Sequence, residues 1–211
     1  MSRSTLATLG ALLAVTATAC SGPQNGQLQV LIRQDGGGAA SVGVALSVAT
    51  DGEVAPESIE SLVIDVVRVD VKPFDVAEED DSKWIRVPVD GDGTVDLMTL
   101  PPTGGEPVAE GAVPATSFKE VRLVCSSDGA LTLTGPVTLP TGEVIGDDEP
   151  LTQSLRIPSC ESSGLKIKGA TFTVPEEGTG VAVVEVTTDA TLGTVKWTGA
   201  GFQLSPVMKL K

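Results

Sequence analysis

The chain has 211 residues, 28 acidic against 14 basic side chains and a net charge of −14, and it contains neither His nor Tyr. An acidic chain repels polyanions, which argues against nucleic acid as a partner. The lack of His removes Ser-His-Asp and Cys-His catalysis and the usual zinc sites. Four Phe and two Trp are too few to build a broad aromatic platform for sugars or bases.

The first nineteen residues form a predicted export signal. Arg3 is their only charge, and an apolar run that ends in small residues extends from Leu6 to Ala19. This order is typical of a secretory signal peptide. The run is too short for a permanent membrane-spanning helix, which needs about 20 apolar residues. We therefore expect residues 1–19 to be cleaved off and the remaining chain to be exported.

The signal ends at Cys20, directly after Ala17, Thr18 and Ala19. Small residues before a cysteine resemble the lipobox of bacterial lipoproteins, in which the thiol receives a diacylglycerol and the cysteine becomes the new N-terminus. The alternative is an ordinary A-x-A cleavage site that Cys20 merely follows. We predict lipidation at Cys20, attachment to a membrane of the cell envelope through this lipid, and, because Ser21 follows, sorting to the outer membrane in a Gram-negative host.

Three cysteines, Cys20, Cys125 and Cys160, are an odd number for an exported chain. If Cys20 carries lipid, the other two remain as one pair, and an oxidising compartment favours a disulfide between them. Two buried free thiols are the alternative. A disulfide would close a loop of about 35 residues and stabilise the fold by roughly 3 to 4 kcal/mol.

After the leader, the sequence predicts a flexible polar tether over residues 20–26 and one domain over residues 27–211. Segments of alternating apolar and polar residues, separated by Gly-rich or acidic turns, are typical of β-strands. An acidic loop is expected between residues 74 and 83. The strands predicted in the first half cover residues 27–34, 41–48, 62–72, 84–89 and 94–97.

Two of the longer predicted strands change their buried face. In residues 62–72 the apolar side chains occupy even positions up to Val66 and odd positions from Val67 onward, which predicts a β-bulge near Val66. In residues 165–174 a similar change comes at Gly169, and glycine suits a bulge. On the outer face of the first of these strands we expect the polar residues Arg68, Asp70 and Lys72.

The second half of the chain continues the same pattern. Pro and Gly between residues 101 and 114 predict an irregular segment, and no convincing amphipathic helix follows it. About a dozen short strands predict an all-β sandwich of Greek-key, immunoglobulin-like or transthyretin-like type. The strands expected here cover residues 120–125, 130–134, 142–145, 153–157, 165–174, 181–187, 194–197 and 202–209.

Residues 155–167 read LRIPSCESSGLKI. This segment resembles the "l-x-v-P-S-G-x-x-T/S-G-L-K-I" core of an uncharacterised prokaryotic family, catalogued as domain of unknown function 4382, with Cys160 in place of a glycine. The resemblance covers about residues 27–210 and implies an envelope lipoprotein or surface domain of β type without an assigned activity. Further segments that are similar to motifs of that family, in the same order, are residues 61–72, 95–100, 113–115, 118–123 and 202–207.

The segment DGDGTVD places Asp90, Asp92 and Asp96 at short spacing on a glycine turn. Carboxylates at such spacing are typical of calcium loops. However, no acidic residue stands at the twelfth position and no helices flank the segment, so it is not a full EF-hand. A plain Asp-Gly hairpin turn is the alternative to a calcium site.

Trp84 and Trp197 are candidate surfaces for stacking on a sugar, although a lone Trp in a β protein more often belongs to the core. The acidic run at residues 78–81 is either a solvated loop or a contact for a cationic partner. Ser159 and Lys166 match no nucleophile motif. Paired carboxylates could hydrolyse a glycoside, but few aromatic side chains are present to hold the sugar, so we predict no catalytic residues.

The sequence thus predicts a non-enzymatic binding or structural domain, held to the cell envelope by lipid, that contacts an envelope protein or a glycan. The alternative is a surface module that binds glycan or calcium. No cofactor is expected apart from the candidate calcium ion.

Overall fold

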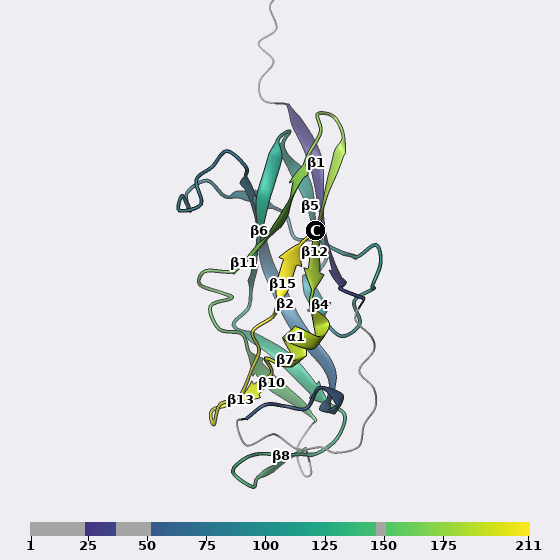
Figure 1. The fold of residues 1–211 in the computed structure, drawn as a ribbon, viewed down its shortest axis with the longest axis vertical. Coiled ribbons are helices and arrows are strands. Elements are labelled where there is room, and N and C mark those ends of the chain that lie inside the picture. The colour runs from purple at the N-terminus through teal and green to yellow at the C-terminus, as the bar shows by residue number, and fades with distance from the viewer. Residues whose placement is uncertain (1–23, 37–51, 147–150) are drawn as a thin grey trace, which may run out of the picture.

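A computed structural model describes residues 24–36, 52–146 and 151–211 (Figure 1). These residues form a nearly all-β fold, as predicted, with one short helix, α1 (Thr188–Leu192), and a single 3-10 turn, η1 (Pro56–Ser58). In this part of the chain, no helix has the length and apolar character needed to cross a bilayer. The strands are β1 Asn25–Gln34, β2 Ile59–Pro73, β3 Ile85–Val87, β4 Thr94–Asp96, β5 Glu106–Pro114, β6 Ser117–Cys125, β7 Asp128–Leu133, β8 Val137–Thr138, β9 Val144–Ile145, β10 Thr152–Arg156, β11 Leu165–Thr173, β12 Thr179–Val186, β13 Lys196–Trp197, β14 Phe202–Gln203 and β15 Met208–Leu210.

The long strand β2 belongs to two parts of the sheet (Figure 1). Its first half pairs with β7 on one edge and β4 on the other, and its second half pairs with β6 and β3. The exchange of neighbours coincides with a register shift between Val66 and Arg68. This confirms the predicted bulge and leaves the extra residue, Val67, 60% exposed while Val66 is buried.

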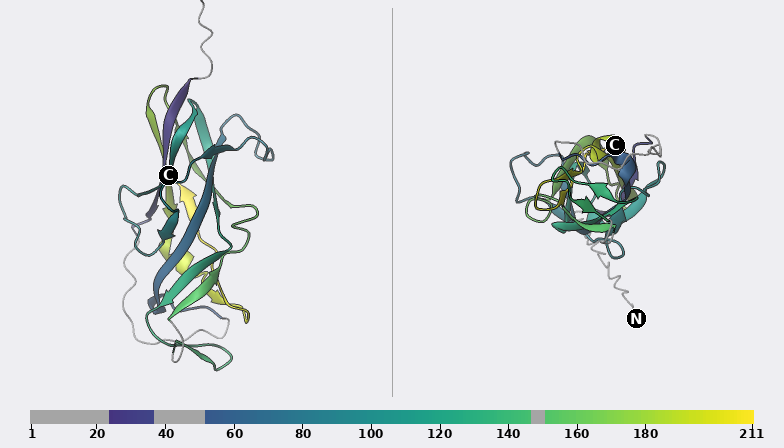
Figure 2. Two further views of the ribbon diagram at one scale, coloured as in Figure 1. Left: turned by 180° about the vertical axis from the view of Figure 1, so that it is seen from behind. Right: turned by 90° about the horizontal axis from the view of Figure 1, so that it is seen from below.

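Around the second half of β2 the strands close into a ring, in the order β2-β6-β11-β15-β12-β1-β5. The circuit is completed by β3, which pairs with β2, and by the residues that follow it, because Val89 bridges to Ala109 of β5. The end-on view in Figure 2 shows strands arranged around a centre. Buried apolar side chains from these strands include Leu28, Val30, Ile32, Val71, Val121, Ile167 and Val184.

Next to the first half of β2 the sheet continues in the order β13-β14-β10-β7-β2, with β4 on the other edge of β2. In Figure 1 this part lies below the ring and makes the molecule elongated. One continuous apolar core runs through both parts. Its members in this lower part include Ile59, Leu62, Leu131, Leu155 and Phe202.

The prediction of an irregular segment over residues 101–114 is confirmed for residues 101–105 but wrong for residues 106–114, which form β5 and pair with β1. The prolines are tolerated because of where they lie. Pro107 stands beside a register shift of the β1–β5 pair, and Pro114 is the last residue of the strand. Both are positions at which a sheet can lack a backbone donor.

Some of the predicted segments lie outside the described residues, and others have different bounds in the structure. The predicted strand at 41–48 lies outside them, as does most of the tether. The strand β1 already begins at Asn25, two residues before the predicted domain boundary. The predicted strand at 142–145 is reduced to β9, which pairs with β8 in a separate two-stranded sheet.

The face change predicted at Gly169 is confirmed by a register shift between Lys168 and Phe172 in the pair of β11 with β6. Gly169 also pairs with Leu210 of β15. A Cβ atom at Gly169 would collide with the carbonyl oxygen of Leu210. Glycine is therefore required here because another backbone approaches closely.

Three strands of the ring share one buried carboxylate, Glu185 of β12. Arg33 of β1 donates to it at 3.0 Å, and Lys209 and Lys211, at the C-terminal end, lie 3.1 and 3.0 Å from Oε1. Burial raises the pKa of Glu185, but hydrogen bonds from Lys211, Lys209 and Arg33 outweigh this effect and lower the pKa to about 2.

This arrangement predicts a pH dependence of stability. Because the folded-state pKa of Glu185 lies below its ordinary value of 4.5, the ionised carboxylate stabilises the fold above pH 4.5, and the contribution is lost as the pH falls towards 2. Glu185→Gln should therefore be less stable than the wild type at neutral pH, and the difference should shrink through this window. Urea unfolding at several pH values measures it, and a difference that does not change with pH would contradict the assignment.

Candidate functional site

The disulfide that the sequence predicts is present between Cys125, at the end of β6, and Cys160, in the turn that follows β10, with their Cα atoms 5.1 Å apart. Both residues are fully buried. The bond fastens the turn between β10 and β11 to the core of the ring. The third cysteine, Cys20, lies outside the described residues.

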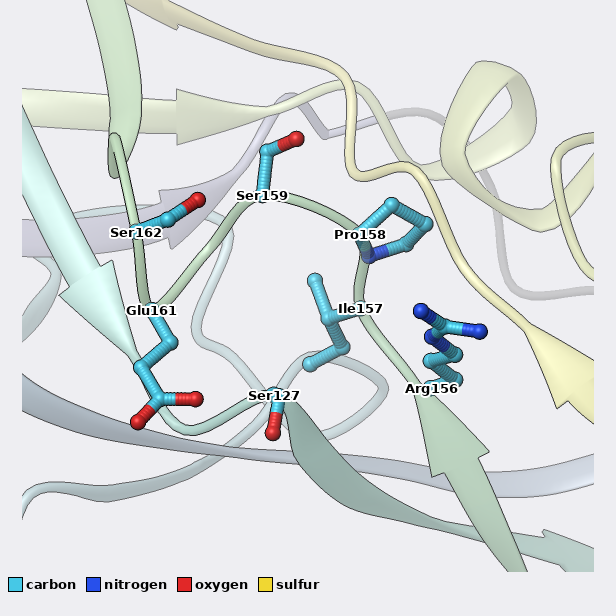
Figure 3. Close-up of a pocket in the computed structure, with 7 residues that line it drawn as sticks. All are labelled: Ser127, Arg156, Ile157, Pro158, Ser159, Glu161 and Ser162. Atoms are coloured by element: carbon cyan, nitrogen blue, oxygen red, sulfur yellow. The ribbon is translucent and has the colours of Figure 1, made fainter.

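A hollow of about 430 Å³ lies beside this turn (Figure 3). Arg156 and Glu161 lie at opposite sides of it, with Ile157 between them, so its charges balance. Ser159 belongs to its lining, but Lys166 donates to both oxygens of Asp81, at 3.0 and 2.9 Å. Lys166 therefore pairs with the carboxylate of Asp81, and among the described residues no hydrogen bond joins it to Ser159.

Of the candidate calcium ligands, Asp90 and Asp92 line one hollow at their turn, and Asp96 does not belong to its lining. Asp96 accepts hydrogen bonds at Oδ1 from the N–H groups of Leu62 and Met98, at 3.1 and 3.0 Å, and at Oδ2 from the Ser61 hydroxyl. Asp92 accepts from the N–H of Thr94. Among the residues that the structure describes, no cluster of three or more metal-binding side chains is present. These bonds fit the alternative of a plain turn.

The two tryptophans lie on different elements, and each contacts other side chains of the protein. The Arg122 guanidinium lies 4.4 Å from the centre of the Trp84 ring, whose Nε1 donates to Asp81. Trp197 packs edge-on against Phe202, with ring centres 5.1 Å apart. The structure assembles no shared aromatic surface from them.

Charged side chains form two cross-strand rows on the outer face of the ring. The first row joins Arg86, Asp70, Arg122 and Lys166 on β3, β2, β6 and β11, each directly opposite the next. The second row joins Lys72, Glu120 and Lys168. Signs alternate over much of this face, which favours pairing across the strands.

Asp70 and Lys72 lie on this outer face, as predicted, but both are buried. Three arginines surround Asp70, and the acidic loop after β2 contacts Lys72. Lys72 donates to the carbonyl oxygen of Glu78 at 2.5 Å, and the Glu78 carboxylate pairs with Lys168 at 2.7 Å. Together with the pair of Asp81 and Lys166, these contacts hold the loop over the strands.

The acidic run at residues 78–81 therefore binds cations of its own sheet. The hydrogen bond from Lys166 lowers the pKa of Asp81, and the hydrogen bond from Lys168 lowers the pKa of Glu78. Both ion pairs are solvent-exposed, and exposed pairs contribute little stability each. Several weak contacts therefore hold the loop over the charged side chains of the two cross-strand rows.

Asp70 is the one carboxylate in the first of these rows, and three arginines surround it. Arg122 donates to Asp70 Oδ2 from Nε and Nη2, at 3.0 and 2.6 Å. Arg68 Nε lies 3.1 Å from the same oxygen, and Arg86 Nε lies 3.8 Å from Oδ1. One carboxylate thus faces three guanidinium groups, and positive charge is in local excess.

Two of these arginines line a second hollow, of about 340 Å³, at the place where β2 exchanges β4 for β3. We call it the fork hollow. The side chain of Arg86 is 70% exposed and that of Arg68 is 33% exposed. The bulge at Val67 adds an exposed apolar side chain. The lining consists of Val67, Arg68, Arg86, Val87, Pro88, Val89 and Val124.

Comparison with protein families gives a match over residues 39–206 to the family described as Domain of unknown function (DUF4382). The chain belongs to this family. The resemblance inferred from residues 155–167 is thereby confirmed. Comparison of the DUF4382 chain with curated proteins gave no match. Comparison with solved structures gave none either.

The motif of the DUF4382 domain at residues 155–167 spans the end of β10, the disulfide turn and the start of β11. Sequence reasoning did not find the fork hollow, although the parity break at Val67 was a signal of it. Arg68 and Arg86 are separated by eighteen residues, and nothing in the residue pattern indicates that both meet at Asp70. The antiparallel pairing of β2 with β3 brings them there.

Proposed function

We propose that this DUF4382 protein is an exported, lipid-anchored protein of the cell envelope, sorted to the outer membrane, whose β domain is a non-enzymatic interaction domain for another envelope protein. The observation that carries the proposal is the buried pair of Cys125 and Cys160. Disulfides persist in oxidising compartments and are rare in the cytosol. With these two cysteines paired, Cys20 is left as the odd thiol, directly after a leader-like segment.

Two observations support a role without catalysis. The chain has no His, and Ser159 and Lys166 match no nucleophile motif, with Lys166 in an ion pair with Asp81. Arg122, Lys166 and Lys168 on the outer face of the ring are paired with carboxylates. Ion pairs between neighbouring strands hold the sheet together, so that it can serve as a scaffold for a binding surface.

The proposal predicts that Cys20→Ser will release the protein from membranes. Produced in a Gram-negative host, the wild type should sediment with the membrane fraction and show the intact mass of a chain that starts at Cys20 and carries acyl groups. Two or more acyl chains anchor a protein stably, whereas one gives only marginal binding. Fractionation, a test for outer-membrane enrichment and intact-mass spectrometry measure the outcome.

The matched control is the double variant Cys125→Ala and Cys160→Ala, which removes two thiols but keeps Cys20. It should remain membrane-bound where it folds. A wild-type protein that is soluble, keeps its leader or has an unmodified Cys20 would overturn lipid anchoring. Reduced Cys125 and Cys160 in the native protein would remove the argument for export.

A further inference from the structure

The fork hollow carries positive charge that the surrounding protein does not neutralise. Arg68, Arg86 and Arg122 share the single carboxylate of Asp70, which leaves an excess of two positive charges among these four groups. The chain as a whole has a net charge of −14. A local positive excess in so acidic a protein favours an anionic group at this place.

Hydrogen-bond donors in the hollow are also unused. Within the described residues, Arg68 approaches an acceptor through Nε alone, and that contact with Asp70 lacks the direction of a hydrogen bond. Arg86 reaches Asp70 only at 3.8 Å. A guanidinium group has five donors in a planar fork that matches a carboxylate. The terminal nitrogens of both side chains are therefore available to a ligand in the described part of the protein.

The rest of the hollow is apolar. The bulge turns Val67 outward, and Val124, Pro88 and Val89 complete the lining. Bulges often re-aim a side chain at a functional site. A volume of about 340 Å³ is at the small end for ligand sites. It has room for a whole amino-acid residue with a branched apolar side chain and is too small for a long acyl chain.

We propose that the fork hollow binds the C-terminal residue of a partner protein, with its carboxylate between Arg68 and Arg86 and a branched apolar side chain on Val67 and Val124. Within a protein chain, only the terminus places a free carboxylate and an apolar side chain on one residue. A free apolar amino acid has both, but its α-ammonium group would be repelled by the two arginines. In a chain terminus that nitrogen is a neutral amide.

This inference rests on the proposed interaction function and names the chemistry of the partner. It is tested with the full-length mature protein, purified from whichever cell fraction it occupies. The probe is the N-acetylated peptide Gly-Ser-Gly-Ser-Gly-Leu with a free C-terminal carboxylate, titrated to millimolar concentration by calorimetry. Its C-terminal amide should bind at least ten-fold more weakly, and so should the same peptide ending in Gly.

The decisive variant is Arg86→Gln, because the Arg86 side chain is exposed and its loss should leave the fold intact. It should weaken binding of the carboxylate peptide at least ten-fold, as expected for a charge-assisted hydrogen bond. The matched control is Arg156→Gln, which removes an arginine from the hollow in Figure 3 and should change binding less than two-fold. Melting temperatures verify that both variants fold.

Three results would overturn the inference: no saturable binding of the carboxylate peptide, equal binding of its amide, or equal effects of the two arginine variants. Competition by N-acetyl-leucine would support it, because that compound has the carboxylate and side chain without the peptide. Binding by a protein that is not lipidated would leave the hollow assigned while the anchoring proposal fails. Lipidation without peptide binding would support the anchoring proposal and overturn the assignment of the hollow.

Discussion

Asp70→Asn should lower the free energy of unfolding by about 3 kcal/mol, within the 3 to 5 kcal/mol range for removing one partner of a buried ion pair. The side chain of Asp70 is 4% exposed, and three arginines approach its two oxygens. Asparagine keeps the shape but not the charge. The variant would leave Arg122, itself mostly buried, beside two further cations without a counter-ion.

The control for this prediction is Arg86→Gln, which removes the most exposed and most distant of the three arginines. Its effect should be within about 0.5 kcal/mol, as for most surface substitutions. Urea unfolding monitored by tryptophan fluorescence is a suitable measurement because Trp84 lies over Arg122. Equal destabilisation by the two variants would show that Asp70 is not the anchor of this charged face.

Removal of the disulfide should have an effect of similar size. The double variant Cys125→Ala and Cys160→Ala should lose about 3 to 4 kcal/mol, since the bond closes a sequence separation of 35 residues in the unfolded chain. A domain at the lower end of the ordinary stability range of roughly 5 to 15 kcal/mol would be brought close to unfolding. The loss should appear as a lower urea midpoint.

Cys20→Ser is the matched control, because it removes a thiol outside the described fold and should leave the urea midpoint unchanged. The wild type treated with a reducing agent should approach the stability of the double variant once its buried disulfide opens. An unchanged urea midpoint in the double variant would show that the disulfide does not stabilise the fold.

Local patterns were sufficient for several features of the fold. The alternation of apolar residues located most strands, and its change of parity at Val66 and at Gly169 located both bulges, because a one-residue slip in a strand exchanges its faces. Cysteine counting identified the disulfide. These features depend on neighbours along the chain or on a small number of candidate pairs.

The same patterns failed where a distant segment changes the environment. Pro107 and Pro114 suggested an irregular segment, yet β5 forms because β1 supplies hydrogen bonds along one edge. Asp70 and Lys72 had the spacing of an exposed face, yet both are buried, Asp70 among three arginines and Lys72 against the loop after β2.

The amino-acid sequence by itself determined the all-β class through its short-range periodicity, and the composition of the first nineteen residues gave the expectation of export. The cysteine count indicated the pairing of Cys125 with Cys160, and the resemblance of residues 155–167 to a family motif indicated the family. Only the tertiary structure decided that the strands close into a ring, that the acidic loop covers charges of its own sheet, and that Arg68 and Arg86 meet at one hollow. The physical reason is that strand pairing joins residues far apart in the chain, and the register of such pairs is set by packing of the whole core.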